Sequence, residues 1–117
     1  MPIPRNPDER IPPVHPGEFL REDFMKPLRL SVTALAAALH VPTSRISAIA
    51  RERRAVDAET ALRLERYFGM SARFWMNAQR QYDLTVAQDR LAGVVRREVT
   101  PMKRARASGA EAQRFLG

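Results

Sequence analysis

The chain of 117 residues has no cysteine, only two histidines and no long apolar run. Without cysteine it can form neither a disulfide bond nor a thiolate metal site, which fits a reducing compartment. No stretch approaches the roughly 20 apolar residues of a membrane-spanning helix, and the N-terminus lacks an apolar secretory segment. These absences predict a soluble, cytoplasmic, single-domain protein with a modest but sufficient core and no membrane partner.

The sequence also offers little for catalysis or for metal binding. No Ser–His–Asp set and no carboxylate pair stands out, and the two histidines, His15 and His40, are far apart. His15 and Glu18 are three residues apart and could share a metal, but the place of His15 beside Pro16 favours a capping role at a helix start. We therefore expect no enzymatic activity, no metal and no cofactor.

Positive charge is concentrated in two segments of the chain. The formal net charge is +7, and all of the excess lies in residues 43–54, with four Arg and one Glu, and in residues 93–117, with six Lys or Arg and two Glu. The rest of the chain is balanced. A basic chain can simply be well solvated, but charge gathered in one helix and one tail favours a nucleic-acid partner.

The most informative stretch is 32–51, VTALAAALHVPTSRISAIAR, which predicts two short helices joined by a tight turn. Leu35 and Leu39 put an apolar stripe on the first helix, and Ile46 and Ile49 lie three residues apart on the second. Both stripes should face one core, which leaves the polar side chains of the second helix outward. The stretch therefore predicts a helix-turn-helix with a surface suited to DNA.

The outward side chains of this stretch are the candidate DNA contacts. Ser44 and Arg45 lie near the start of the second helix, the part that enters a major groove in this architecture. An arginine can bond guanine O6 and N7 together, which contributes about 1–3 kcal/mol of discrimination. For the arginines after the helix, phosphate contact is favoured over base readout. The candidates are Thr33, Thr43, Ser44, Arg45, Ser47, Arg51, Arg53 and Arg54; the alternative for each is an ordinary solvated surface.

The other segments predict three further helices with an arm and a tail. Residues 1–14 contain five prolines and should form an extended arm. Helices are expected over 15–28, from a cap at Asp57 to Gly69, and from a cap at Ser71 to about Leu91. Residues 93–117 are basic and broken by proline and glycine, so we expect a flexible tail with a short helix at 109–116.

Five motifs in this order resemble those of HigA-type antitoxins. They are HPGEF at 15–19, VPTSRIS at 41–47, TALRL at 60–64, FG at 68–69 and FWMNAQ at 74–79. The HigA/VapI family belongs to the XRE class of lambda-repressor-like helix-turn-helix proteins, and the resemblance covers roughly residues 15–92. It implies an all-α, five-helix domain that represses its own operon and neutralises a RelE-like (HigB-type) toxin, a ribonuclease that cleaves translated mRNA.

The chain departs from the commonest family pattern at two helix ends. His40 and Glu52 stand where many relatives have glycine, at positions that favour a left-handed backbone. A histidine tolerates this conformation at a cost of about 1 kcal/mol relative to glycine. We expect mild local strain at both positions.

The family resemblance also implies a homodimer on double-stranded operator DNA. Two recognition helices would then enter successive major grooves about 34–36 Å apart on a palindromic site. Trp75, Ala78 and Tyr82 give the last helix more apolar surface than a five-helix domain need bury, so we predict that they form the dimer interface. At helical spacing with Phe74, Trp75 also fits a place in the core.

Two alternatives stay open at this point. The first is a dimeric helix-turn-helix transcriptional regulator of the same fold without a toxin partner. The second is an interaction module in which the DNA motif is vestigial, against which the polar character of Thr43, Ser44, Arg45 and Ser47 speaks. The role of the basic tail is open between phosphate binding, contact with a partner and solubility.

Overall fold

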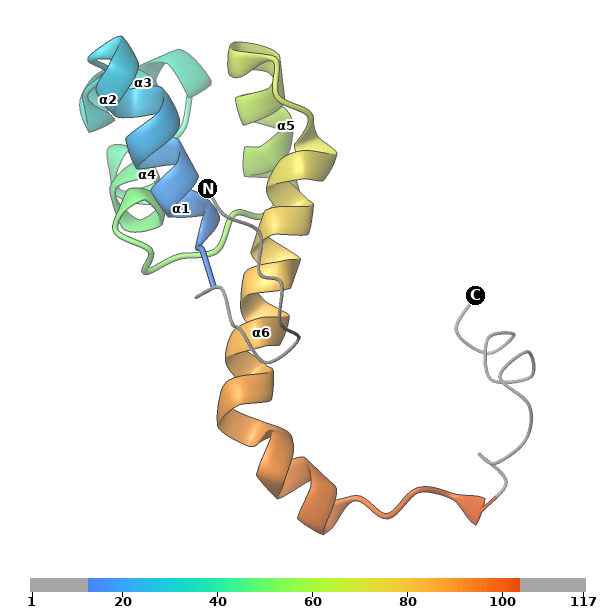
Figure 1. Cartoon of the computed structure of the whole chain (residues 1–117). Helices are drawn as coiled ribbons and strands as arrows, with labels where there is room; N and C mark the ends of the chain where they lie inside the picture. The colour runs from blue at the N-terminus through green and yellow to red at the C-terminus, as the bar shows by residue number, and fades with distance from the viewer. Residues whose placement is uncertain (1–12, 104–117) are drawn as a thin grey trace, which may run out of the picture. The chain divides into compact units, whose positions relative to one another are not determined.

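The computed structural model describes residues 13–103, and within them every regular element is helical. The elements are α1 (Pro16–Phe19), the π-helix η1 (Leu20–Met25), α2 (Lys26–Leu28), α3 (Val32–Leu39), α4 (Thr43–Ala50), α5 (Ala58–Phe68) and α6 (Ala72–Glu98) (Figure 1). Because α1, η1 and α2 follow without a break, they form the single helical run predicted over 15–28. The prediction of five helices, all-α, is confirmed for the described residues.

The middle of the first helical run is a π-helix, a feature that the sequence analysis did not foresee. Pro27 lies in the third turn, where it has no N–H to donate and its ring clashes with a carbonyl one turn earlier in a regular α-helix. The N–H of Lys26 donates to the carbonyl of Arg21, five residues earlier, which is the wider π pattern. This widening accommodates the proline, and the run ends at Arg29 in a left-handed conformation.

The predicted caps are formed in the structure. The Ser31 hydroxyl accepts the N–H of Ala34, the Asp57 carboxylate accepts that of Thr60, and the Ser71 hydroxyl accepts that of Phe74. These bonds satisfy amide groups that a helix leaves unpaired in its first turn. They fix where α3, α5 and α6 begin.

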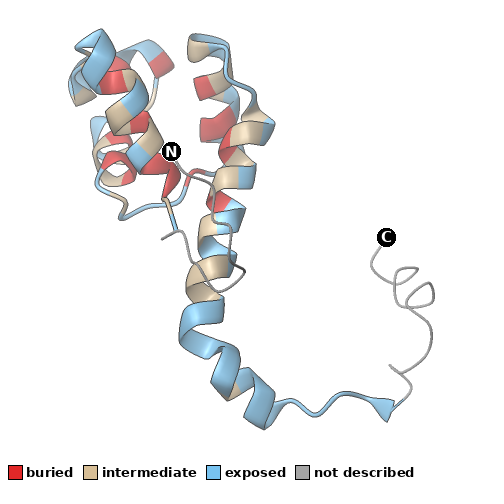
Figure 2. Cartoon of the chain, in the orientation of Figure 1, coloured by how far each residue is buried: buried red, intermediate tan, exposed pale blue. Residues whose placement is uncertain are grey.

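The core lies in the first compact unit, which ends at Val86, and is formed by apolar side chains from η1, α3, α4, α5, the start of α6 and Val56. Its fully buried large residues include Leu20, Leu35, Ile46, Ile49, Leu64 and Trp75. Figure 2 shows buried positions on α1, η1, α3, α4 and α5 and on the N-terminal part of α6. Leu28, at the end of the first helical run, lies outside this core and is 59% exposed.

Helix α6 is longer than predicted and reaches the second compact unit, which begins at Ala87. We expected it to end near Leu91, but it ends at Glu98. Gly93 costs a helix only about 1 kcal/mol relative to alanine, and Val94 and Val95 continue the helix beyond it. The helix therefore continues past residue 93, where we expected the tail to begin. Most of the predicted arm (1–12) and the predicted helix at 109–116 lie outside the described residues.

Candidate nucleic-acid interface

The turn between α3 and α4 has the geometry of a tight helix-turn-helix. His40 ends α3 with a positive φ of 57°, and the N–H of Val41 donates to the carbonyl of Ala36, a 3.0 Å bond. Together these close a Schellman-type end, the arrangement for which glycine is usual. α3 and α4 then pack against each other (Figure 1). The expected left-handed conformation of His40 is confirmed.

α4 is seated on α1 by the residues of the HPGEF motif. Nδ1 of His15 accepts the N–H of Gly17 at 2.8 Å, which caps α1 as predicted. A Cβ at Gly17 would collide with the carbonyl oxygen of Ile49 on α4, so only glycine allows the two backbones this close. Arg21 then donates to the carbonyl of Ala50 at the end of α4. α4 is thus held at both its inner face and its C-terminus.

The predicted base-reading residues lie at the start and on the outer side of α4. Thr43 and Ser44 are exposed, whereas Arg45 and Ser47 are half-buried. Thr33 is exposed in the first turn of α3. The inner face carries Ile46 and Ile49, both fully buried as expected. The exposed hydroxyls of Thr43 and Ser44 therefore lie at the start of α4, opposite its buried inner face.

Arg45 differs from the expectation of an outward-pointing side chain. Its side chain is only 18% exposed, and its Nη1 lies 3.4 Å from Oε1 of Glu59 in the first turn of α5. Its Nε is buried and has no hydrogen-bond partner. The carboxylate of Asp57, the α5 cap, also feels Arg45: hydrogen bonding to Thr60 chiefly lowers the pKa of Asp57, with smaller contributions from Arg45 and Arg54. Arg45 is thus coupled to α5.

Three arginines follow α4 in the loop that leads to α5. Arg51, Arg53 and Arg54 are all exposed. Glu52, the one acidic residue among them, lies within 3.2 Å of Arg21 and has a positive φ of 64°. Because Glu52 pairs with Arg21 on η1, it leaves the loop with a cluster of exposed positive charge suited to phosphate.

The three residues predicted for the dimer interface differ in how far they are buried. Trp75 is fully buried within a single chain, against Phe24 and Phe74, so the prediction that it contacts a second copy was wrong. The other possibility, that Trp75 lies in the core, is confirmed. Ala78 and Tyr82 keep partial exposure, and the ring of Tyr82 meets that of His15 edge-on with centroids 4.9 Å apart. These two side chains border a shallow groove with Pro13 and Phe19.

Two residues that position the site were missed by the sequence analysis. Gln79 is buried, and its side-chain oxygen accepts the N–H of Val56 at 2.8 Å, which anchors the loop that carries the exposed arginines. Glu59 contacts Arg45 and Arg63. The spacing of Glu59 and Arg63, four residues apart in a helix, was a signal for the second contact; nothing in the sequence pointed to the first.

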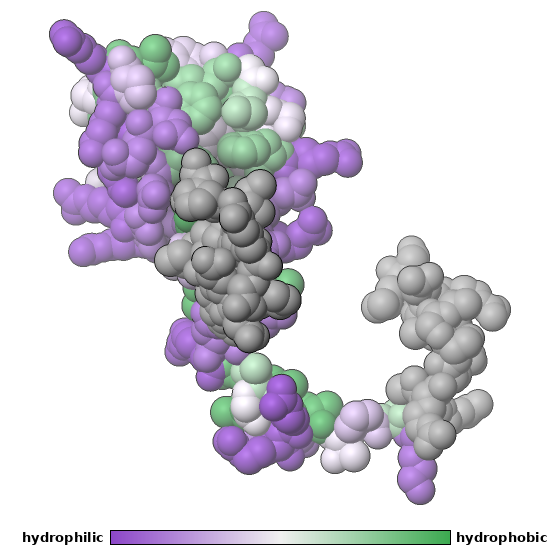
Figure 3. Space-filling model, viewed as in Figure 1, coloured by the Kyte–Doolittle hydropathy of each residue, from purple (hydrophilic) through white to green (hydrophobic). Residues whose placement is uncertain are grey.

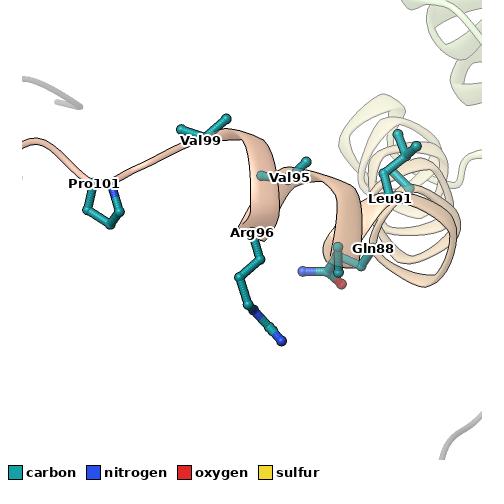
Figure 4. A pocket seen from close by; sticks show the side chains of 8 residues that line it. Gln88, Leu91, Val95, Arg96, Val99 and Pro101 are labelled. Carbon is teal, nitrogen blue, oxygen red and sulfur yellow. The ribbon is translucent and has the colours of Figure 1, made fainter.

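The second unit carries an apolar stripe on the C-terminal part of α6. Leu91, Val95 and Val99 lie on one side of the chain, while Arg96 points away from them (Figure 4). All three apolar side chains are largely exposed. Figure 3 shows hydrophobic surface beside hydrophilic side chains along this part of the chain.

The described part of the chain has neither a metal-binding cluster nor a membrane-spanning helix. Among residues 13–103 no group of three His, Cys, Asp or Glu side chains could hold a metal ion. No helix in this range is both long and apolar enough to cross a membrane.

Known proteins resemble this chain over the region that contains the helix-turn-helix. The helix-turn-helix family model matches residues 22–75. Virulence-associated protein I of Dichelobacter nodosus is 54% identical over 88 residues, which is 75% of this chain and 81% of that protein. The matched family region contains α3, the turn and α4 in full.

Two solved structures have the same fold and are bound to DNA. The Pseudomonas aeruginosa antitoxin HigA with the higBA promoter is 42% identical, has a TM-score of 0.73, and covers 77% of this chain and 98% of its own. The antitoxin GraA in complex with its operator is 38% identical, has a TM-score of 0.74, and covers 80% of this chain and 95% of its own.

Proposed function

The chain belongs to the HigA family of helix-turn-helix proteins, and we propose that it is the antitoxin of a type II toxin–antitoxin system. In this proposal it represses its own operon by binding operator DNA through α3 and α4. It also binds and neutralises a RelE-like (HigB-type) toxin that cleaves mRNA. The proposal gives the protein no catalytic role of its own.

One observation carries the DNA-binding half of the proposal. The outer side of α4 presents Thr43, Ser44 and Ser47 beside Arg45, and the exposed arginines follow immediately in the chain. This joins a base-reading surface to a phosphate-binding surface on one scaffold. Sequence-specific proteins combine these two kinds of contact in the same way.

The geometry suggests how the contacts divide. The start of α4 enters the major groove, where Ser44 and Arg45 reach base edges. Thr33, in the first turn of α3, faces a phosphate with its hydroxyl and with the free amide groups of the helix start. Arg51, Arg53 and Arg54 bind phosphates on either side of the groove. Steric occlusion of the promoter then represses transcription.

We also propose that the protein binds its operator as a homodimer. Two copies of α4 would occupy successive major grooves about 34–36 Å apart on a palindromic site. Of the interface first predicted, Ala78 and Tyr82 remain available on α6. The dimer predicts that a half-site duplex binds much more weakly than the complete palindrome.

A binding experiment tests the DNA-binding half. Fluorescence anisotropy compares a labelled duplex from the protein's own promoter with a scrambled duplex of equal length and composition, at two salt concentrations. The proposal expects promoter binding at least about a thousandfold tighter than scrambled binding, with affinity falling steeply as salt rises. Equal affinity for the two duplexes would contradict sequence-specific repression.

A further inference from the structure

The Arg45 side chain is held by a carboxylate from the neighbouring helix in the absence of DNA. Its Nη1 lies 3.4 Å from Oε1 of Glu59, a long contact for an ion pair that is hydrogen-bonded. Its Nε is buried without a partner. A guanidinium has five N–H donors in a fixed plane, so most of its hydrogen-bonding capacity is unused here. Arg45 is therefore retained by Glu59 but not fully satisfied by it.

Glu59 has a second partner that does not depend on Arg45. Nε and Nη2 of Arg63 both lie 3.1 Å from Oε2 of Glu59, and Nη1 of Arg63 donates to the carbonyl of Leu39 at 2.9 Å. Leu39 is the last residue of α3. The carboxylate thus connects the end of α3, through Arg63, with the recognition arginine on α4. It keeps its own position when Arg45 leaves.

We propose that Glu59 is a specificity-determining residue of the DNA interface, because it holds Arg45 until a matching base takes its place. The inference rests on the proposed function and assigns Glu59 a role in its DNA specificity. One guanidinium edge can pair with a carboxylate or with guanine O6 and N7, but not with both at once. A cognate guanine compensates for the lost contact to Glu59. A mismatched base does not, so Arg45 stays with the carboxylate.

The same carboxylate disfavours binding to DNA that lacks the operator sequence. The Glu59 side chain is 56% exposed. Beside the Glu59 carboxylate, Arg45 contributes less to the attraction toward phosphate that dominates non-specific binding. Without Glu59, the guanidinium is free to bind phosphates on any sequence. Glu59 therefore lowers non-specific affinity more than operator affinity.

The test is the ratio of affinities for promoter and scrambled duplexes in the full-length protein with Glu59→Gln. The amide keeps an oxygen for Arg63 but loses the charge that holds Arg45. We expect the ratio to fall about fivefold or more, within the range of a single arginine–guanine contact, mainly because scrambled DNA binds more tightly. Glu65→Gln is the matched control, since it makes the same charge change on α5 at a residue that has no contact with Arg45.

Two further variants test whether Glu59 acts through its contact with Arg45. Glu59→Asp preserves the charge but shortens the side chain, so it should lower the ratio in the same direction as Glu59→Gln if the contact with Arg45 matters. In an Arg45→Ala background, Glu59→Gln should leave the ratio unchanged. Thermal melting by circular dichroism identifies any variant that fails to fold. If Glu59→Gln fails to fold, the affinity ratio of Glu59→Asp tests the proposal in its place.

The results separate this inference from the proposed function. A wild-type ratio near one would contradict the proposed function itself. A clear wild-type preference that survives Glu59→Gln, or that falls equally with Glu65→Gln, would overturn the role of Glu59 alone. An equal fall in the Arg45→Ala background would show that Glu59 acts on DNA by charge and not through Arg45, which also overturns the inference.

Discussion

Nη1 of Arg21 lies 3.2 Å from Oε2 of Glu52, a residue 31 positions later, and donates as well to the carbonyl of Ala50. Arg21 belongs to η1, and Glu52 follows the end of α4 with a left-handed backbone. The ion pair joins two side chains that are each about one third exposed. It explains how a glutamate can occupy a position that favours glycine: the contact offsets part of the backbone cost.

This relationship predicts different stabilities for two substitutions of Glu52. Glu52→Ala loses the ion pair and keeps the left-handed backbone cost, so it should destabilise the fold. Glu52→Gly also loses the pair but removes that cost, which leaves it more stable than the alanine variant by about 1 kcal/mol. Urea denaturation of the two variants and the wild type measures the difference. An alanine variant as stable as the glycine variant would show that the backbone carries no strain here.

Arg45 and Arg53 should affect DNA binding in different ways. Arg45→Ala should weaken binding by about 1–3 kcal/mol and selectively relax preference at one operator position. Arg53→Ala should weaken binding across all sequences and reduce the dependence of affinity on salt. Titrations against a panel of single-base operator variants at several salt concentrations measure both effects. Identical profiles for the two variants would contradict this division of roles.

Gly17 and Gly93 provide a matched pair for the packing of α1 on α4. Gly17→Ala places a methyl group against the backbone carbonyl of Ile49, so it should destabilise the protein by about 1–3 kcal/mol or more. Gly93→Ala meets only the end of the Arg97 side chain, at 3.9 Å, and should stabilise α6 by about 0.5–1 kcal/mol. Thermal and urea unfolding compare them. Tolerance of Gly17→Ala would argue against the close approach of these helices.

His15 should make the fold sensitive to mild acid. Burial lowers the pKa of His15, although the carboxylates of Glu52 and Asp83 partly oppose this. As the pH falls below about 6.5, the usual value of an unfolded histidine, the unfolded chain takes up this proton before the folded one does. The free energy of unfolding should therefore decrease as the pH falls through this range. It is measured by urea denaturation between pH 7.5 and 5.5.

His15→Asn is the control for this pH dependence. Asparagine can also cap a helix start but does not titrate in this range. The variant should unfold with a smaller change in free energy between the two pH values than the wild type. An equal change in both proteins would assign the acid sensitivity to another group.

The parts of the fold that depend on local chemistry could be predicted from the sequence. Ser31, Asp57, Ser71 and Gly69 mark helix ends because a cap needs only a side chain or a backbone conformation within a few residues. The burial of Ile46 and Ile49 followed from their spacing in one short helix. The left-handed backbone of His40 followed from its place after the last apolar residue of α3.

The features of the fold and site that could not be predicted from the sequence depend mostly on contacts between distant segments. Trp75 has the spacing of a surface stripe as well as of a core residue, and only the aromatic rings packed around it decide between the two. The contact of Arg45 with Glu59 spans 14 residues and two helices. The π turn near Pro27 and the continuation of α6 past Gly93 are both cases in which neighbouring residues outweigh an unfavourable one.

The most direct test of the proposed antitoxin role is purification of the tagged protein from cells that carry its native operon intact. A small protein encoded next to it should co-purify in a fixed ratio. That protein should arrest growth and cleave mRNA when expressed alone, and co-expression with this chain should restore growth. If the protein instead purifies only with itself while still binding its own promoter, it is a regulator without a toxin, and the central claim is wrong.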